Sequence, residues 1–244
     1  MLGIVKFNFL IFLTCVSLSN NCKEFVEVKL WGGCYSIKYT NELNISGAGL
    51  SGKIPKEIAK LVNLQIIDLS NNRLSGSIPK EIGELKNLKH VYLQDNLLMG
   101  SIPNEIGNLK SLTRLFLSNN RLSGSIPNTI KNLKNLEYLY LFKNNLSGSI
   151  PKEIGELKNL FKLDLSSNML SGAIPLEIGS LVKLNSLRLF SNNLIGPIPA
   201  EIGNLDDLEF LFLHNNLLDK KIPIEVIKLK SMKYSNLGNS SIVD

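Results

Sequence analysis

Leucine recurs at a fixed spacing of 24 residues through most of this 244-residue chain. The leading leucine of each repeat stands at Leu64, Leu88, Leu112, Leu136, Leu160, Leu184 and Leu208. A fixed period of this length is typical of solenoids, in which each repeat forms one coil and contacts only its neighbours. The pattern therefore predicts a single elongated domain.

Within each repeat, the first apolar residues alternate with residues of other kinds. In Leu139-Tyr140-Leu141 the two leucines point one way and the tyrosine points the other way, as in a short strand with one buried face. A whole coil separates each such strand from the next, so hairpin pairing is excluded. We expect one strand per repeat in a parallel sheet.

An asparagine follows every predicted strand, where the chain must turn out of the sheet. A buried turn has amide and carbonyl groups that need partners, and a carboxamide supplies both donors and acceptors. We therefore predict a ladder that joins neighbouring coils through Asn72, Asn96, Asn120, Asn144, Asn168, Asn192 and Asn216.

The second half of the repeat predicts an extended segment followed by a short helical turn. We expect Leu146 and Ile150 to point inward, and Gly148 to allow close approach of the next coil. Pro151 suits the first position of the helical turn, and Gly155 is expected to end that turn.

The consensus LxxLxLxxNxLSGxIPxEIGxLxx, seen in residues 64–87 and 136–159, resembles the plant-type leucine-rich repeat over residues 43–231. The resemblance implies an α/β solenoid, a right-handed superhelix with one short parallel strand per repeat on the concave face. Short 3-10 or helical turns would line the convex side. Plant receptor ectodomains and polygalacturonase inhibitors carry such repeats and use the concave face for recognition.

The chain begins with a segment typical of a secretory signal. Residues 1–19 combine Lys6 with an apolar run and the small residues Ser17 and Ser19, and the run is short for a span that needs ~20 apolar residues. The prediction is cleavage and secretion to the cell wall or cell surface. The alternative is an uncleaved N-terminal anchor; we expect no other membrane segment.

Signal removal would leave two cysteines, Cys22 and Cys34, which we expect to form a disulfide in an oxidising compartment. A metal site needs more ligands than this pair offers, so no metal is predicted. Residues 20–41, with Trp31 before Cys34, resemble the end of the plant-type N-terminal cap. About eight coils follow in residues 42–231, and residues 232–244 read as an incomplete C-terminal coil.

Secretion would make three Asn-x-Ser triplets candidates for glycosylation, at Asn44, Asn145 and Asn239. We expect a glycan at Asn145 to limit access to the strands from one side.

The aromatic residues of the repeats fall at or beside the outward strand positions, which inverts their usual preference for the core. Clustered exposed aromatics are enriched in binding surfaces. The predicted ligand face comprises Tyr92, Phe116, Tyr138, Tyr140, Phe142, Phe190, Phe210, Phe212 and His214, with Asp164 and Arg188 as adjacent polar residues. The alternative is that aromatic pairs only stabilise neighbouring strands, by ~0.2–1 kcal/mol each.

The net charge of +6 and a pI near 9.1 raise the question of an acidic partner. Lysines recur at Lys86, Lys110, Lys134 and Lys158, outside the strands, where a charged stripe is most often a solvated face. We therefore predict no nucleic-acid binding. An acidic polysaccharide or a membrane surface stays open as an alternative partner.

Spacing along the coils argues against catalysis. Asp68 and Asp164 are four strands apart, ~19 Å at the strand spacing of a sheet, whereas paired glycosidase carboxylates lie within ~9.5 Å. His90 and His214 are five repeats apart. We predict a non-enzyme without catalytic residues or cofactors.

The sequence thus predicts a secreted recognition module that binds a protein, peptide or polysaccharide through its concave face, with a membrane co-receptor as a further partner. Two alternatives are an inhibitor of a secreted cell-wall hydrolase and a structural or adhesive wall protein that uses the regular array itself.

Overall fold

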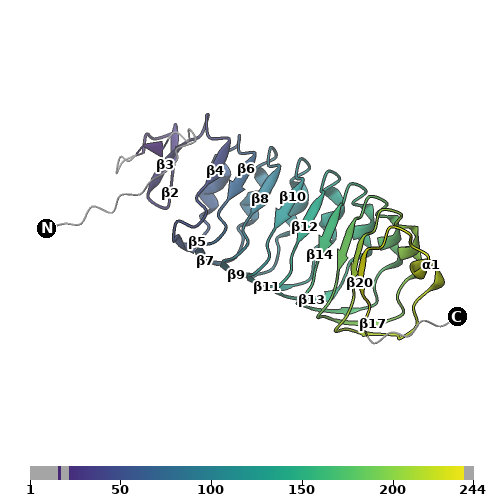
Figure 1. The fold of residues 1–244 in the computed structure, drawn as a ribbon. Coiled ribbons are helices and arrows are strands. Elements are labelled where there is room, and N and C mark those ends of the chain that lie inside the picture. The colour runs from purple at the N-terminus through teal and green to yellow at the C-terminus, as the bar shows by residue number, and fades with distance from the viewer. Residues whose placement is uncertain (1–15, 18–21, 239–244) are drawn as a thin grey trace.

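The computed structural model describes residues 16–17 and 22–238, and it forms a coiled ribbon with one coil per 24-residue repeat (Figure 1). In this part of the chain, nine short strands make a parallel sheet with each strand beside the next one along the solenoid. These strands are β4 (Glu42–Asn44), β6 (Ile66–Asp68), β8 (His90–Tyr92), β10 (Arg114–Phe116), β12 (Tyr138–Tyr140), β14 (Lys162–Asp164), β16 (Ser186–Arg188), β18 (Phe210–Phe212) and β20 (Tyr234–Asn236). We call the outward side of this sheet the strand face.

A second parallel sheet lies along another side of each coil, and the sequence pattern predicted only an extended segment there. Its eight described strands are β5 (Ser51–Lys53), β7 (Arg73–Gly76), β9 (Leu97–Gly100), β11 (Arg121–Gly124), β13 (Asn145–Ser149), β15 (Met169–Gly172), β17 (Asn193–Gly196) and β19 (Leu217–Leu218). Leu146 and Ile150 point inward, as predicted, and are buried.

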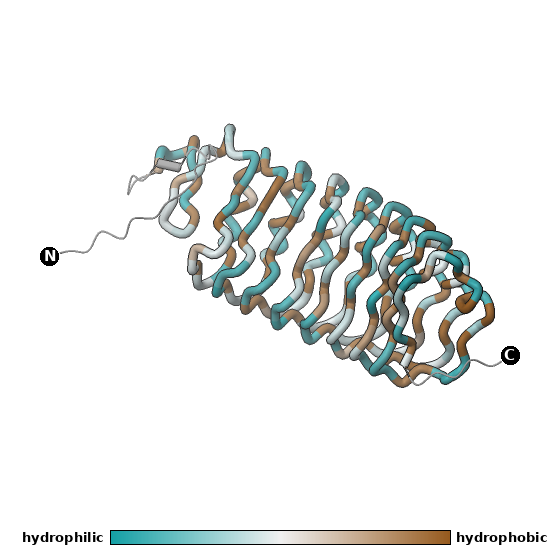
Figure 2. Tube along the Cα trace, viewed as in Figure 1, coloured by the Kyte–Doolittle hydropathy of each residue, from teal (hydrophilic) through white to brown (hydrophobic). Residues whose placement is uncertain are grey.

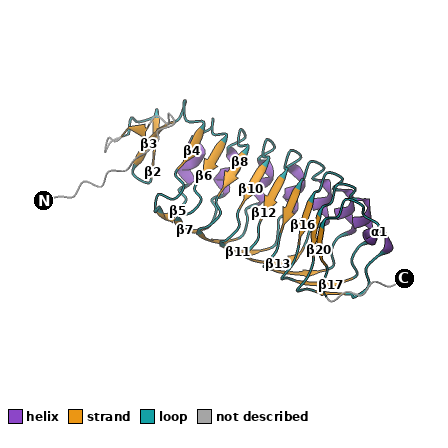
Figure 3. Cartoon of the chain, viewed as in Figure 1, coloured by secondary structure: helices purple, strands orange, loops and turns teal. Residues whose placement is uncertain are grey.

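Short helical turns form the third side of the coil, behind the strands of the first sheet (Figure 3). In the described residues they are the 3-10 helices η1 (Lys56–Lys60), η2 (Lys80–Glu84), η3 (Asn104–Asn108), η4 (Asn128–Asn132), η5 (Lys152–Glu156), η6 (Leu176–Ser180) and η7 (Ala200–Asn204), then the α-helix α1 (Ile224–Ile227). Each proline is the extended residue before the turn, as Pro151 is with ψ 135°, so the prediction that it occupies the first helical position was wrong.

One continuous core runs the length of the solenoid. Leucines and isoleucines from the three sides of every coil meet inside, and those of the central coils are almost fully buried. Figure 2 shows the resulting alternation of hydrophobic and hydrophilic segments along each coil. Stability in such a structure is approximately the sum of coil stabilities and of interfaces between neighbours.

Asparagines bond neighbouring coils at the edge where the strands of the first sheet end. The Oδ1 atom of Asn120 accepts from the backbone N–H of Leu98 at 3.0 Å, and its Nδ2 donates to the carbonyl of Leu93 at 2.9 Å, both in the preceding coil. The same Nδ2 also donates to the carbonyl of Leu117, in its own turn. The other positions of the predicted ladder make the equivalent bonds, at Asn72, Asn96, Asn144, Asn168, Asn192 and Asn216.

A second asparagine ladder lies at the opposite edge, where the strands begin, and it was not predicted. Each of these side chains donates from Nδ2 to a carbonyl 25 residues earlier, as Asn135 does to Lys110 and Asn159 does to Lys134, both at 2.9 Å. Asn63 and Asn87 make the same bond. Both edges of the first sheet are therefore tied from coil to coil.

The two repeated glycines have roles opposite to those predicted. Gly148 has φ +77°, and a Cβ there would make only an ordinary contact. Glycine is therefore required at this position by its left-handed backbone conformation, not by close approach of the next coil. Gly155 lies inside η5 and does not end the turn; a Cβ on it would come 2.4 Å from the carbonyl oxygen of Glu177 in the next coil. Where Ala59 and Lys131 replace this glycine, the helical turns contact the next turn less extensively.

The ends of the solenoid differ from its middle. An antiparallel hairpin of β2 (Glu27–Leu30) and β3 (Gly33–Ser36) precedes the coils, and β1 (Val16–Ser17) pairs with β3. A disulfide joins Cys22 to buried Cys34 with the Cα atoms 5.4 Å apart, which confirms the predicted pairing.

At the C-terminal end of the solenoid, Ile227 occupies the close-approach glycine position. A large side chain fits there because no described helical turn packs against α1 on that side. Most of the predicted signal, residues 1–15 and 18–19, lies outside the described residues.

Replacing Asn120 with alanine should lower the free energy of unfolding by roughly 1–3 kcal/mol, because the buried N–H of Leu98 loses its acceptor. Urea denaturation followed by circular dichroism measures the change. Asn128→Ala, at an exposed position of η4, is the matched control. Equal midpoints for the two variants would contradict a stabilising ladder.

Gly155→Ala should also destabilise the solenoid, by roughly 1–3 kcal/mol, because the added methyl group overlaps the backbone of η6. Lys131→Ala is the control, since a longer side chain already occupies the same position of the repeat. If thermal unfolding places both variants at the wild-type midpoint, the close approach at Gly155 does not constrain the fold.

Candidate functional site

Aromatic side chains form a strip across three adjacent strands of the strand face. Tyr92, Phe116 and Tyr140 occupy one register of β8, β10 and β12. Phe116 and Tyr140 are stacked with ring centroids 4.5 Å apart, whereas Tyr92 meets Phe116 edge to face at 5.1 Å. None of the three belongs to the buried core, so their rings face outward.

A cation and a second tyrosine fix this strip from the side. Nη1 of Arg114 donates to the hydroxyl of Tyr92 at 3.2 Å, and its guanidinium lies 5.4 Å from the centre of the Tyr138 ring. Burial first, and then the charges of Arg114 and Lys89, lower the pKa of neighbouring His90.

A second aromatic group covers the strands that follow. Phe190 stacks on His214 with the centroids 4.8 Å apart, and Phe210 stacks on Tyr234 at 5.4 Å. The guanidinium of Arg188 lies 5.4 Å from the centre of the Phe212 ring. Tyr234 was not among the predicted ligand residues.

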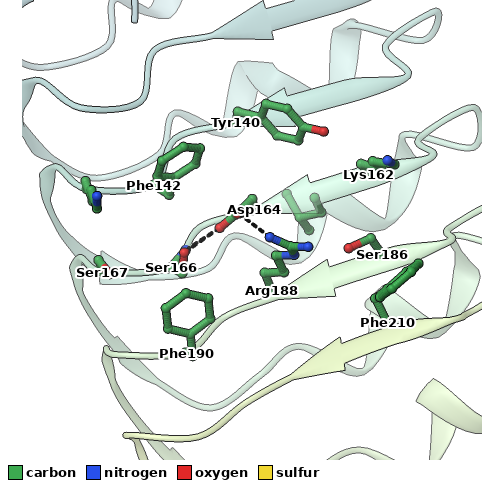
Figure 4. Close-up of a pocket in the computed structure, with 12 residues that line it drawn as sticks. Tyr140, Phe142, Lys162, Asp164, Ser166, Ser167, Ser186, Arg188, Phe190 and Phe210 are labelled. Atoms are coloured by element: carbon green, nitrogen blue, oxygen red, sulfur yellow. Dashed lines mark hydrogen bonds and ion pairs between the residues drawn. The ribbon is translucent and has the colours of Figure 1, made fainter. Parts of the chain in front are cut away.

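A hollow of about 360 Å³ separates the two aromatic groups. Tyr140 and Phe142 line one side, and Phe190 and Phe210 line the other (Figure 4). The outward positions of β14 and β16 carry no rings, whereas the neighbouring strands β12 and β18 carry rings at theirs, and the short side chains of Asp164 and Ser186 leave the space open. Ser186 stands in register between Lys162 and Phe210, and it is only 5% exposed.

Asp164 and Arg188 form the polar floor of this hollow. Oδ1 of Asp164 accepts from the backbone N–H of Ser166 at 3.0 Å and from its hydroxyl at 2.6 Å. Oδ2 lies 4.0 Å from Nη1 of Arg188, which is an ion pair too long for a hydrogen bond. Asp164 was predicted as an outward polar residue, but it is buried at 7% exposure, whereas Arg188 is exposed.

Burial raises the pKa of the Asp164 carboxyl above its ordinary value, and the bonds from Ser166 and the charge of Arg188 oppose that effect only in part. The pKa of Tyr140 is raised too, first by burial and then by the charge of Asp164. With Lys143 and Lys162 also on its rim, the hollow carries more positive than negative charge. Its chemistry suits an anionic group attached to an apolar one.

Sequence reasoning missed six residues that complete the lining of the hollow, Lys143, Lys162, Leu163, Ser166, Ser167 and Ser186. The signal was available, since serines occupy outward positions in two adjacent repeats that aromatic residues flank on both sides. The gap between the two aromatic groups, rather than the aromatic residues themselves, defines the site.

The structure places the candidate glycosylation sites on different surfaces. Asn44 ends β4 on the strand face and is exposed. Asn145 begins β13 and is exposed there, so a glycan would project from the second sheet instead of limiting access to the strand face. Asn239 lies outside the described residues.

Two further features of the described residues bear on function. Cys22, Glu27 and Cys34 come together, but the two sulfurs are bonded to each other and offer no thiolate ligands. Among the described helices, none has the length and apolar character needed to cross a bilayer.

Comparison with protein families identifies the class. A family model described as leucine-rich repeat region matches residues 4–143, and one described as leucine rich repeat matches residues 135–157, 159–181 and 183–205. The chain belongs to the leucine-rich repeat family. No curated protein matches it.

Solved structures of plant proteins share the fold. The peptide hormone receptor RGFR1, in complex with RGF2, is 40% identical with a TM-score of 0.78, over 80% of this chain and 31% of that one. The Arabidopsis receptor kinase HAESA, in complex with the peptide hormone IDA and the co-receptor SERK1, is 38% identical with a TM-score of 0.68, over 79% and 36%. A plant ice-binding protein is 27% identical with a TM-score of 0.65, over 84% and 74%. The chain spans about a third of each receptor chain.

The buried carboxylate gives a pH-dependent prediction. Because the pKa of Asp164 is higher in the folded state, the folded protein binds this proton more tightly than the unfolded chain does, and stability from this group rises as pH falls toward the ordinary Asp value. Asp164→Asn should therefore be at least as stable as wild type at pH 7 and lose this dependence. Thermal unfolding from pH 7 to pH 4 measures it.

Asp68→Asn is the control, since Asp68 makes the same bonds to Ser70 at a half-buried position. A clear loss of stability for Asp164→Asn at pH 7 would show that the ion pair with Arg188 outweighs the cost of burial.

Proposed function

We propose that this chain is a secreted recognition module that binds an extracellular peptide across its strand face. The observation that carries the proposal is the hollow between Tyr140 and Phe210, which offers an apolar slot with a charged floor. Aromatic and arginine side chains around a partly enclosed pocket are the groups that dominate binding energy in protein interfaces.

The contacts of Arg188 indicate the chemistry of the bound group. Its guanidinium makes no close hydrogen bond to Asp164 and rests beside the ring of Phe212, so its donors are free to bind a ligand carboxylate or sulfate. An apolar ligand side chain would insert between Phe142 and Phe190. Tyr92 and Phe116 would support the neighbouring part of an extended peptide.

Relatives support a peptide over the other ligand classes. RGFR1 was solved with the peptide RGF2, and HAESA with the peptide IDA and the co-receptor SERK1. We therefore propose that the ligand of this chain is a peptide and that a co-receptor is a further partner. We also propose that the protein is extracellular and carries glycans at Asn44 and Asn145. The chain could also inhibit a secreted hydrolase through the same face, in which case the bound peptide would be a loop of that enzyme.

Ice binding is a second candidate, because the likeness to a plant ice-binding protein extends over most of both chains. A lattice requires a regular surface, however, and the outward residues of the strand face change from one strand to the next. The hollow at β14 and β16 interrupts that face in the middle. The strand face therefore suits an irregular ligand better than a crystalline one.

Filling the hollow, or removing the charge of Arg188, should weaken peptide binding without unfolding the protein. We predict that peptides selected on the full chain from a phage-displayed random library combine an acidic group with a large apolar side chain. Ser186→Phe and Arg188→Gln should each weaken their binding by at least tenfold, about 1.4 kcal/mol, in calorimetry. Phe210 already occupies the register beside Ser186, so a ring is compatible with the sheet.

Ser123→Phe, at an exposed position of the second sheet, is the matched control. Circular dichroism confirms that each variant is folded. Selected peptides that bind Ser186→Phe and Arg188→Gln with wild-type affinity would overturn the hollow as the ligand site.

A further inference from the structure

A row of lysines follows the edge at which the strands of the first sheet begin. Lys86, Lys110, Lys134 and Lys158 precede the positions of the second asparagine ladder, and all four side chains are exposed. The carbonyls of Lys110 and Lys134 accept the ladder bonds of Asn135 and Asn159. The 24-residue repeat places these lysines one per coil, at about the 4.8 Å spacing of adjacent strands, and the ladder bonds the backbone of the two central ones to the next coil.

One of the four lysines is paired with an acid: Nζ of Lys134 lies 2.7 Å from Glu156, whose charge offsets it. Among the described residues, Lys86, Lys110 and Lys158 have no carboxylate within ion-pair distance. Nζ of Lys158 donates to the carbonyl of Ser180 at 3.1 Å, and Nζ of Lys86 donates to that of Gly83. These bonds leave the ammonium charges in place, so the edge presents a line of cations.

The row ends beside a separate shallow hollow of about 300 Å³, lined by Glu137, Tyr138, Asn159, Phe161 and Lys183. Phe161 is 37% exposed and is held edge to face by Tyr138, with the centroids 6.0 Å apart. Lys183 replaces the ladder asparagine in its coil and donates to Oδ1 of Asn159 at 2.8 Å. An exposed ring, an amide, a further cation and the carboxylate of Glu137 therefore meet at the end of the lysine row. Nζ of Lys162 also lies 5.8 Å from the centre of the Phe161 ring, so one part of that ring already has a cation beside it.

We propose that this edge binds a linear acidic polysaccharide, a polyuronate, whose carboxylates follow the lysines while one sugar ring rests on Phe161. A row one lysine wide fits a single polymer chain with a charge on each unit. A membrane surface would need a broad basic face with apolar side chains to insert. The site is distinct from the hollow at Arg188, so it holds whether or not that hollow binds peptides.

The test compares two variants that lose the same charge. Lys86, Lys110 and Lys158 are replaced together by glutamine in one, and Lys56, Lys80 and Lys152, exposed lysines on the helical turns, are replaced in the other. Binding of the full chain to polygalacturonic acid is measured over a salt series. The first variant should bind roughly tenfold more weakly and with a smaller salt dependence, because it releases fewer counterions. The second variant should bind like wild type. If both variants lost the same affinity, the effect would come from net charge alone, and the proposal would be overturned.

Phe161→Ala should weaken binding to polygalacturonic acid with the salt dependence unchanged, because it removes stacking and leaves the charges. Unchanged affinity for this variant would overturn the role of the hollow. Single-stranded DNA and vesicles of anionic phospholipid are tested in parallel. Binding to either of them that equals or exceeds binding to polygalacturonic acid would overturn the assignment of the polymer class. Neutral dextran should not bind, and the peptides selected on the strand face should bind all these variants normally.

Discussion

Hydrogen bonding between successive coils is the constraint on which this structure depends. No coil can satisfy its own backbone groups, because its strands are parallel and pair only with the strands before and after them. The two asparagine ladders extend this pairing to the turns at both edges of the first sheet, where the chain leaves the ladder of strands. Unpaired buried amides are costly, so each asparagine of the main ladder that accepts from a buried N–H of the preceding coil stabilises two coils at once. The bonds of the second ladder are exposed and go to carbonyls.

Close approach on the opposite side of the coil adds a steric constraint. Gly155 leaves no room for a Cβ against the next helical turn, and the same position accepts Ala59 and Lys131 where the turns are less tightly packed. At the last described turn it accepts Ile227. The repeat thus keeps most of its contact positions nearly constant, and most of the variation between repeats falls on surfaces that no neighbouring coil covers.

The strand face uses that freedom in an uneven way. Rings occupy all the outward positions of β8, β10, β12 and β18 except that of Arg114, and those of Tyr92, Phe116 and Tyr140 contact each other across strands, so part of their role is to stabilise the sheet. Stabilisation alone does not account for the gap at β14 and β16, where a buried carboxylate and an exposed guanidinium lie between aromatic walls. A buried charge is unfavourable for folding, and such groups are concentrated at functional sites.

The sequence by itself determined the repeat, the parallel sheet, the inward leucines, the main asparagine ladder and the outward direction of the aromatic residues. All of these follow from local alternation and from a spacing of 24 residues, which are properties of the linear chain. Tertiary structure decided what depends on contact between coils: the second sheet, the different roles of Gly148 and Gly155, the burial of Asp164 and the hollow above Ser186. Those features arise because residues one repeat apart become neighbours, and the space between them depends on the size of both side chains.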